Sequence, residues 1–456
     1  MTVSRESEVT TKNPGRVSGV LDRTLGLFFE FFQVSSDNEK LLLILSCAVA
    51  FGYLELLGAM HGAWLLDAQG HPLARDFAAF WSAGRQALAG AALATYDPNL
   101  QHAAEVATVG HAFGGGLGWS YPPVFLLAVA MLACLPYASA FVAWCVATIA
   151  LYGGVVAAIS ERRIGFMIAL AAPWVPMALS LGQNGFLTAA IIGLVLLNLE
   201  NRPVVSGLIL GLLSYKPQFG ILFPFALAAG GYWRAFVSAA VAAAAWNGLA
   251  GAVFGFATLG AFLDALSLTA QTHLIAPGLG WKVQSLYGLV RTLGGSGTVA
   301  WTAQALIAFS TLVLVVVFWR TKMPFSIKAA FLAAAVTLPT PYIFFYDLPV
   351  LAVALAFVYR HRRFDKIEIA LIAGAIPCVF ASFWLVVPSA WLASLAVAAI
   401  ALRRCYSSVQ AHRSGESRVS AYACSVAHEI GRVPTQRLMG PPPVPTIQNT
   451  HRQAPS

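Results

Sequence analysis

Apolar runs long enough to cross a bilayer recur along most of this chain, from residue 41 to residue 402. Hydrophobic residues make up 58% of the sequence and charged residues only 10%, and the mean hydropathy is +0.72. Because a soluble domain carries about 25% charged residues, this pattern excludes an ordinary water-soluble fold. A transmembrane helix needs about 20 apolar residues, so the runs predict an all-α polytopic membrane protein with roughly 12 transmembrane helices.

Basic residues lie mainly between the apolar runs and in the two terminal segments. The positive-inside rule keeps such clusters in the cytoplasm, so the formal net charge of +9 does not indicate a nucleic-acid partner. We expect a cytoplasmic N-terminal segment (1–40), a transmembrane domain (41–402) and a disordered cytoplasmic tail (403–456). The expected location is the cell inner (plasma) membrane, as a multi-pass protein in contact with membrane lipids.

The N-terminal part carries two local predictions. Residues 20–32 mix aromatic and charged side chains, which is typical of an amphipathic helix on the membrane surface. Residues 41–66 form the first predicted span, which contains Glu55 and His61. Ionisable residues inside a membrane are candidates for function, and a buried pair or a water-lined crevice is the alternative.

The longest polar interruption of the apolar pattern extends over residues 67–120. Long connections with little structure of their own are functional or disordered, and the aromatic residues in this one disfavour disorder. We expect it to be an extracytoplasmic active-site loop. It contains four carboxylates, which are Asp67, Asp76, Asp97 and Glu105.

Asp76 is the candidate general base. It follows the first predicted span closely, and aromatic residues come directly after it. A partly desolvated carboxylate can take a proton from an attacking hydroxyl, whereas a salt bridge to Arg75 or Arg85 is the structural alternative. Trp81 would offer an apolar wall or a stacking face for a sugar. We expect Asp97 and Glu105 to matter less for turnover.

A G-Q-N-G motif at residues 182–185 separates two apolar runs. Its glycines permit a tight turn. The side-chain amides of Gln183 and Asn184 could donate to and accept from substrate hydroxyls. A plain loop tip is the alternative interpretation.

An isolated lysine, Lys216, lies in the motif S-Y-K-P-Q, where Pro217 breaks the helix beside it. A lone lysine between apolar runs needs an anion such as a phosphate, unless its side chain reaches the membrane surface. Asp347 ends a later polar motif, T-P-Y-I-F-F-Y-D, where helix capping is the simpler explanation.

The side of the membrane depends on how often the chain crosses between residues 121 and 160. Two full crossings would place Arg162 outside, whereas one net crossing places five later basic clusters in the cytoplasm. We prefer one crossing. The G-Q-N-G, S-Y-K-P-Q and T-P-Y-I-F-F-Y-D motifs then lie on the same side as Asp76.

Several other classes of site are absent from the sequence. It has no D-x-D motif and no glycine-rich phosphate loop. The spacing of its six cysteines indicates neither a zinc site nor a disulfide framework. We therefore expect no metal and no other cofactor.

Together, the motifs resemble those of glycosyltransferase family 87, the polyprenyl-phosphate-mannose-dependent mannosyltransferases with the GT-C membrane fold. The resemblance extends from residue 41 to about residue 360, and Phe80 stands where the family often has Tyr. It rests on an ordered set of motifs, which are D-F-x-x-F-W-x-A-G-R-x-x-L-x-G (76–90), Y-D-P (96–98), Y-P-P-x-F (121–125), L-P-Y-x-x-A (135–140), G-Q-N-G (182–185), G-L-L-x-Y-K-P-Q (211–218) and Y-D-L-P (346–349).

The resemblance implies a GT-C-like fold, a lipid-phosphate sugar donor and a catalytic base at Asp76. The expected substrate-binding residues are Arg75, Trp81, Arg85, Tyr121, Gln183, Asn184, Lys216, Gln218, Tyr346 and Asp347.

The expected function is transfer of a hexose, with mannose as the expected sugar, from a polyprenyl-phosphate donor to a hydroxyl of a lipid or glycan acceptor. Transfer would take place at the extracytoplasmic face and invert the anomeric centre. A transporter or flippase of lipid-linked sugars is the main alternative, but such folds usually show paired repeats, and none is evident here. A non-catalytic scaffold would not need Asp76, Lys216 and Gln183 to converge.

Overall fold

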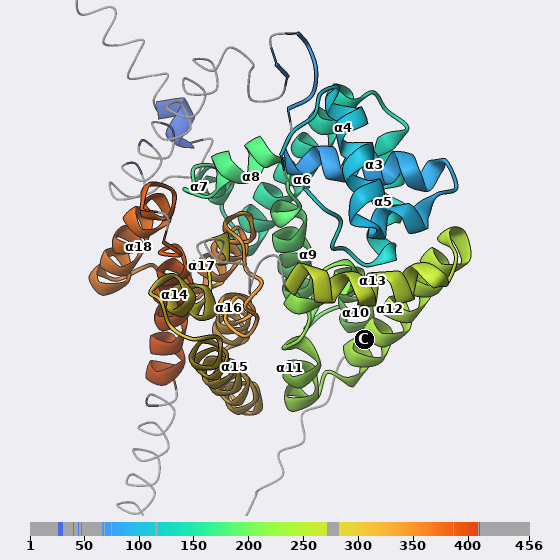
Figure 1. Cartoon of the computed structure of the whole chain (residues 1–456). Helices are drawn as coiled ribbons and strands as arrows, with labels where there is room; N and C mark the ends of the chain where they lie inside the picture. The colour runs from blue at the N-terminus through green and yellow to red at the C-terminus, as the bar shows by residue number, and fades with distance from the viewer. Residues whose placement is uncertain are drawn as a thin grey trace, which may run out of the picture. The chain divides into compact units, whose positions relative to one another are not determined.

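Every named element in the described part of the chain is a helix (Figure 1). The computed structural model describes residues 26–30, 40, 44, 47, 66–67, 69–73, 75–114, 117–270, 282–385, 387–408 and 410. Contacts divide the chain into two units, Met1–Tyr406 and Ser407–Ser456, and the fold below is that of the first. Among the described residues the only extended pairings are two isolated bridges, Leu66 with Pro72 and Val283 with Phe344. The all-α prediction is confirmed for this part of the chain.

Several predictions fall on parts of the chain that the structure does not describe. They are the first span with Glu55 and His61, most of the surface helix at residues 20–32, and nearly all of the tail. Residues 26–30, 40, 44 and 47 are helical. The domain boundaries predicted at residues 40 and 402 therefore stay predictions.

The segment predicted to be a long loop is folded into helices instead. It contains α3 (Asp76–Leu88), the short 3-10 helix η1 (Ala92–Tyr96) and α4 (Pro98–Val109). The aspartate and proline of the Y-D-P motif start α4, because Asp97 accepts hydrogen bonds from two backbone N–H groups and Pro98 needs no helical partner. The periodic apolar residues of α3 give it a buried face against its neighbours.

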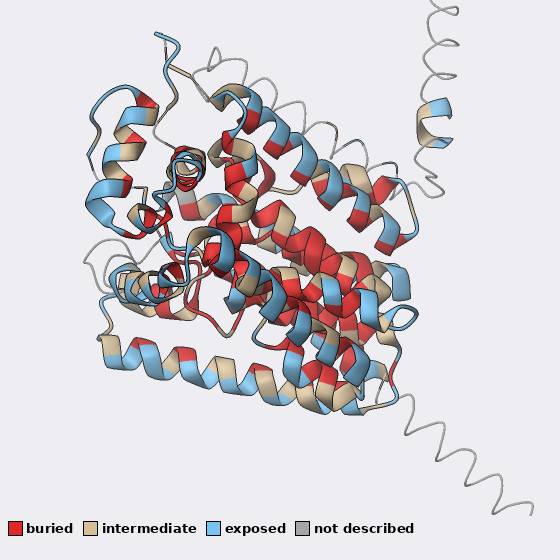
Figure 2. Ribbon diagram, turned by 90° about the vertical axis from the view of Figure 1, so that its right-hand side faces the viewer, coloured by how far each residue is buried: buried red, intermediate tan, exposed pale blue. Residues whose placement is uncertain are grey.

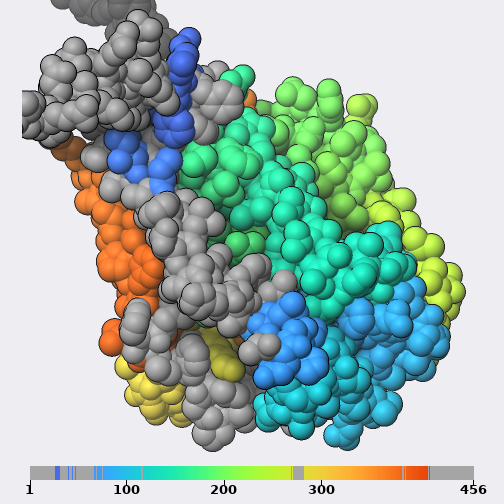
Figure 3. Space-filling model, turned by 90° about the horizontal axis from the view of Figure 1, so that it is seen from above, coloured from blue at the N-terminus to red at the C-terminus, as the bar shows by residue number. Residues whose placement is uncertain are grey.

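Two helices follow this segment and differ in length. The first, α5 (Pro123–Ala133), has 11 residues and is about 16 Å long, too short for a hydrocarbon core of about 30 Å. The second, α6 (Tyr137–Ser160), has 24 residues and is long enough. Their lengths agree with one net crossing rather than two. Seen from above, the blue to teal part of the chain, which includes α3 to α6, forms a continuous face (Figure 3).

The core is built around α6, α9 (Gly185–Asn198) and α17 (Val350–His361), which pack on one another. Buried residues gather in the middle of the helical body, and the outer helices carry exposed faces (Figure 2). Glu161, directly after α6, forms an ion pair of 2.7 Å with Arg360 near the end of α17. The ends of α6 and α17 therefore lie together, so these two helices run in the same direction.

Close approach of α10 (Pro203–Gly211) and α12 (Trp233–Phe254) depends on small residues. A Cβ added at Gly207 would lie 2.0 Å from the hydroxyl of Ser238, and one at Gly211 would lie 2.4 Å from the Cβ of Ala242. Small residues spaced by four are a common device of helix packing in membranes.

The remaining elements complete the order along the chain. They are α7 (Ile164–Leu170), α8 (Val175–Leu181), η2 (Leu212–Tyr215), η3 (Pro217–Phe219), α11 (Phe223–Gly230), α13 (Ala257–Ala270), α14 (Leu286–Thr292), α15 (Gly297–Arg320), α16 (Phe325–Ala335), η6 (Phe345–Asp347) and α18 (Lys366–Trp384), followed by a helical segment at residues 391–408.

Three helices in the described residues are long and apolar enough to cross a membrane: α6, α12 and α15. The bent pair α7 and α8 could make a fourth span. The predicted number of roughly 12 is not reached among the described residues. One physical reason is that prolines such as Pro136 and Pro217 divide apolar runs into shorter helices.

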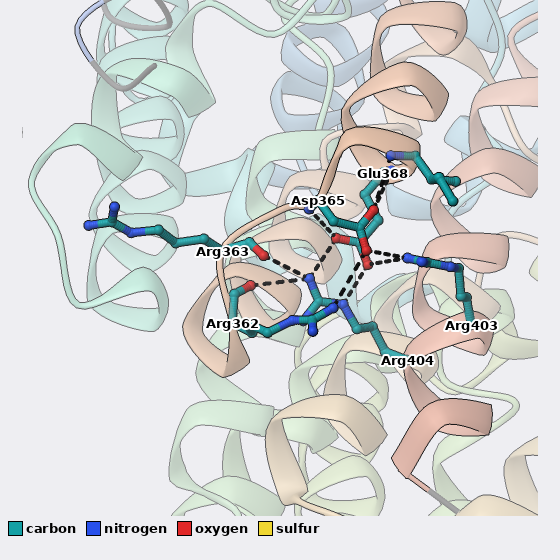
Figure 4. A network of polar contacts seen from close by, with 7 residues as sticks. Arg362, Arg363, Asp365, Glu368, Arg403 and Arg404 are labelled. Carbon is teal, nitrogen blue, oxygen red and sulfur yellow. Dashed lines mark hydrogen bonds and ion pairs between the residues drawn. The ribbon is translucent and has the colours of Figure 1, made fainter. Parts of the chain in front are cut away.

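A polar network joins the start of α18 to residues 403 and 404 (Figure 4). Glu368 is fully buried and accepts two hydrogen bonds of 2.5 Å from Arg404, while Arg403 lies 2.5 Å from Asp365. Because Arg162 also donates to the Tyr359 hydroxyl at 3.0 Å, the basic clusters at 161–163, 360–366 and 403–404 lie together.

Candidate active site

Four segments that are distant in the sequence meet through their polar side chains. Asp76 begins α3, Gln183 and Asn184 form the turn between α8 and α9, Lys216 lies between η2 and η3, and Asp347 ends η6. Hydrogen bonds connect these residues in two adjoining groups, one around Asp76 and one around Lys216. Seven of the predicted site residues belong to them: Asp76, Tyr121, Gln183, Asn184, Lys216, Tyr346 and Asp347.

The first group is centred on the carboxylate of Asp76. Its Oδ2 accepts a hydrogen bond of 2.8 Å from the side-chain amide of Gln183, whose own oxygen accepts one of 3.2 Å from the Tyr121 hydroxyl. No ion pair links Asp76 to Arg75 or Arg85 among the described residues. The salt-bridge alternative is therefore not what the structure shows.

The environment of Asp76 favours its protonated form. Burial raises the pKa of Asp76 above its ordinary value, and the Gln183 hydrogen bond together with the charges of Lys282 and Arg75 only partly offsets this. Its place in the first turn of α3, which is not one of the candidate spans, favours the carboxylate. A base with a raised pKa holds a proton more readily than a free carboxylate does.

The second group is a buried ion pair. The ammonium of Lys216 lies 2.5 Å from Oδ1 of Asp347 and 2.7 Å from the side-chain oxygen of Asn184, and these side chains are at most 3% exposed. The rings of Phe219 and Tyr346 lie 5.3 and 5.2 Å from the nitrogen. Lys216 is therefore not the isolated cation that the sequence suggested, because Asp347 is its anion.

Asp347 has the capping role that was its simpler explanation, and it also forms an ion pair that the sequence did not predict. One carboxylate oxygen pairs with Lys216, and the other accepts a hydrogen bond of 3.0 Å from the backbone N–H of Phe344. The second contact holds the chain at the start of η6. Asp347 thus acts as a cap and as an ion-pair partner at the same time.

Both glycines of G-Q-N-G are required by the geometry. Gly182 ends α8 with φ of +65°, and its carbonyl accepts from the indole of Trp144 at 2.9 Å. A Cβ at Gly185 would lie 1.6 Å from the carbonyl oxygen of Tyr346. This contact brings η6, and with it Asp347, against the first turn of α9. The motif is therefore a packed turn and not a free loop tip.

Three predicted binding residues lie apart from these groups. The indole of Trp81 donates to the carbonyl of Leu135 at 3.0 Å, and the exposed guanidinium of Arg85 lies over the same ring at 5.6 Å. Gln218 is partly exposed and makes no side-chain hydrogen bond to a described residue. The structure does not bring these three side chains to Asp76. Arg75 is close enough to act on it electrostatically.

The other carboxylates of the 67–120 segment support its structure. Glu105 is fully buried and accepts hydrogen bonds of 2.9 Å from the backbone N–H groups of Leu117 and Gly118. Asp97 caps α4, as described above. Both side chains hold the segment in shape, so substitution of Glu105 is expected to disturb folding even though we expected little effect on turnover.

Two contributors were missed by sequence reasoning. Lys282 lies close enough to Asp76 to lower its pKa, although nothing in the sequence connects the two residues. The Tyr215 hydroxyl lies 2.5 Å from the Thr188 hydroxyl, and it donates to the backbone carbonyl of Asn184 in the G-Q-N-G turn at 3.5 Å. Its place next to Lys216 in the S-Y-K-P-Q motif was the available signal. The described residues include no group of three or more His, Cys, Asp or Glu side chains that could hold a metal.

Comparison with known proteins gives one match. The family model of glycosyltransferase family 87 matches residues 119–341, a range that contains Tyr121, Gln183, Asn184 and Lys216. Asp76 and Asp347 lie outside the matched range. Neither the curated proteins nor the solved structures gave a match. The match confirms the resemblance seen in the motifs and indicates a glycosyltransferase: over residues 119–341 the chain is similar to glycosyltransferase family 87.

Proposed function

We propose that this protein transfers a hexose, with mannose as the expected sugar, from a polyprenyl-phosphate donor to a hydroxyl of a lipid or glycan acceptor. The observation that supports this best is the contact of Asp76 with Gln183. It joins a carboxylate of raised pKa to a turn that lies within the family match. A carboxylate and several cations in one place suit sugar transfer from a lipid phosphate without a metal.

The proposed reaction has one displacement step. Asp76 takes the proton of the acceptor hydroxyl as the hydroxyl oxygen attacks the anomeric carbon of the donor. The bond from that carbon to the phosphate oxygen breaks, and polyprenyl phosphate leaves with the bonding electrons. Attack opposite the leaving group inverts the anomeric centre. The proton on Asp76 then returns to solvent.

Cationic side chains would stabilise the phosphate as it leaves. A lysine ammonium has three donors, and Lys216 uses two of them on Asn184 and Asp347. The third is the one we assign to a phosphate oxygen. Arg75 and Lys282 add positive charge near Asp76. Tyr121, Tyr346 and Asn184 complete the proposed lining, and Trp81, Arg85 and Gln218 stay candidates for contacts farther along the substrates.

The arrangement of α6 and α17 supports an extracytoplasmic site. Both helices begin near the candidate site, since Tyr137 at the start of α6 packs on Phe77 at 5.4 Å and α17 follows Asp347. Both end at the basic clusters around Glu161 and Arg360. The positive-inside rule assigns that end to the cytoplasm, so the opposite end, which carries Asp76, faces outward.

The test is transfer in vesicles that contain the protein. Polyprenyl phosphate carrying radiolabelled mannose is supplied with vesicle lipids, and label in lipid or glycan products is separated from intact donor. We expect label in products with the parent and about background with Asp76→Asn. The proposal is wrong if the label crosses the membrane only as intact donor, the result for a flippase. It is also wrong if a nucleotide sugar serves equally well.

A further inference from the structure

The amide of Gln183 and the amide oxygen of Asn184 are already occupied by protein partners, whereas Nδ2 of Asn184 has no hydrogen-bond partner among the described residues. The nitrogen of Gln183 donates to Asp76, and its oxygen accepts from the Tyr121 hydroxyl and from the backbone N–H of Asn184 at 3.2 Å. The side-chain oxygen of Asn184 accepts from Lys216. Because Gln183 is 5% exposed and both ends of its amide have protein partners, that side chain is not free to turn toward a substrate.

The hydrogen-bond chemistry determines how the Gln183 amide is oriented. The backbone N–H of Asn184 can only donate, so the amide oxygen of Gln183 must face it and the amide nitrogen faces Asp76. The amide oxygen then faces the two donors, Tyr121 and the Asn184 backbone. Three partners therefore hold the amide in one orientation, and Asp76 Oδ2 is held with it. Oδ1 of Asp76 accepts no hydrogen bond from a described residue, which leaves it for the acceptor proton.

We propose that Gln183 is a positioning residue that holds Asp76 Oδ2 so that Oδ1 faces the acceptor hydroxyl, and is not itself a sugar ligand. This inference rests on the proposed function for its catalytic meaning. The next residue, Asn184, holds Lys216 in a similar way, through its side-chain oxygen. One turn therefore sets the separation between the base and the cation, and the backbone between residues 183 and 184 is their common support.

Removal of the Gln183 hydrogen bond has a predictable electrostatic result. This bond stabilises the ionised form of Asp76, so its loss raises the pKa of Asp76 further. The other groups that act on Asp76 come from four different segments and stay in place in a Gln183 variant. They are Arg75, Lys282, Glu105, Tyr121 and Tyr346.

The experiment measures protonation of Asp76 directly, so it does not depend on transfer activity. Purified full-length protein in lipid is treated with a hydrophobic carbodiimide, which reacts with protonated carboxyl groups, and modification of Asp76 is followed by mass spectrometry against pH. Gln183→Met keeps the length of the side chain and removes the donor. Gln183→Asn keeps the amide but shortens its reach by one methylene and serves if the Met variant does not fold. Asn184→Leu is the matched control.

Both Gln183 variants should shift the midpoint of Asp76 modification upward by about one pH unit or more, and Asn184→Leu should leave it in place. In the transfer assay, Gln183→Met should lower kcat about 10- to 100-fold with less effect on KM. An unchanged midpoint in a folded Gln183 variant overturns the inference, as does an effect on KM alone, which identifies a sugar ligand. If Asp76 of the unsubstituted protein is modified as expected but the protein transfers no sugar, the proposed function is wrong. The positioning contact between Gln183 and Asp76 is then unaffected.

Discussion

The ammonium of Lys216 lies 2.5 Å from the carboxylate of Asp347, although the two residues are 131 positions apart. Both side chains are shielded from solvent. A buried ion pair adds little net stability, but removal of one partner leaves an uncompensated buried charge. Any test of Lys216 in donor binding must therefore avoid leaving Asp347 as an unpaired buried charge.

Lys216→Met alone should destabilise the protein by about 3–5 kcal/mol, as measured by denaturant unfolding of the purified protein in detergent. The double variant Lys216→Met with Asp347→Asn should recover most of this loss, because no buried charge is left without a partner. Donor binding is then measured in the double variant. If Lys216→Met alone is as stable as the parent, the ion pair does not form. If the stable double variant binds donor as well as the parent does, Lys216 is not a phosphate ligand.

Asp76→Asn should lower turnover by at least about 10²-fold, because general-base catalysis contributes about 10²–10⁴-fold. Donor binding should be retained, since the amide has nearly the same shape. Asp97→Asn is the matched control, because asparagine caps a helix as well as aspartate does. The measurement is kcat in the vesicle transfer assay with donor binding in parallel. Near-parental turnover of Asp76→Asn would exclude Asp76 as the base.

The pH dependence of transfer should reflect the raised pKa of Asp76. A base works only when ionised, so activity should fall as the pH is lowered through a pKa above the ordinary 3.8. The raised pKa also means that the folded protein favours the protonated form, so ionisation of Asp76 costs stability as the pH rises through that value. Asp76→Asn should therefore be at least as stable as the parent at neutral pH. Transfer activity that falls only below about pH 4 would contradict the buried environment of Asp76.

Gly185→Ala should displace η6 and reduce transfer, because the new Cβ would lie 1.6 Å from the Tyr346 carbonyl oxygen. The backbone must shift, and Asp347 shifts with it. Gly248→Ala in α12 is the control, since no atom lies within 4 Å of its Cβ position and alanine is the better helix former by about 0.5–1 kcal/mol. Thermal unfolding and transfer are compared for the two variants. Equal behaviour would mean that the close contact at Gly185 is absent.

Membrane sidedness can be tested with single cysteines in a cysteine-free background. Asn99 on α4 and Ser407 are both exposed, so an impermeant thiol reagent can reach them from their own side of the membrane. We expect Asn99→Cys to react in intact cells and Ser407→Cys only after permeabilisation. The opposite pattern would place the candidate site in the cytoplasm and remove the argument for a lipid-linked donor.

Local sequence patterns were sufficient for much of the fold and part of the site. Apolar length predicts α6, α12 and α15 as membrane helices, and glycine spacing predicts the turn at residues 182–185. These features depend on neighbours within a few positions, where backbone preferences and helix periodicity act. The family resemblance was also visible from ordered motifs, and the match over residues 119–341 confirms it.

Only the tertiary structure decided which polar residues are partners. Sequence reasoning assigned a substrate phosphate to Lys216 as its anion, assigned Gln183 to substrate hydroxyls, and grouped Trp81 and Arg85 with Asp76. The packing of α9 against η6 at Gly185 instead joins Lys216 to Asp347, and the same turn joins Gln183 to Asp76. Such contacts link residues more than a hundred positions apart. A buried polar group is almost always hydrogen-bonded, and the packing determines which partner lies near it. No local pattern contains that information.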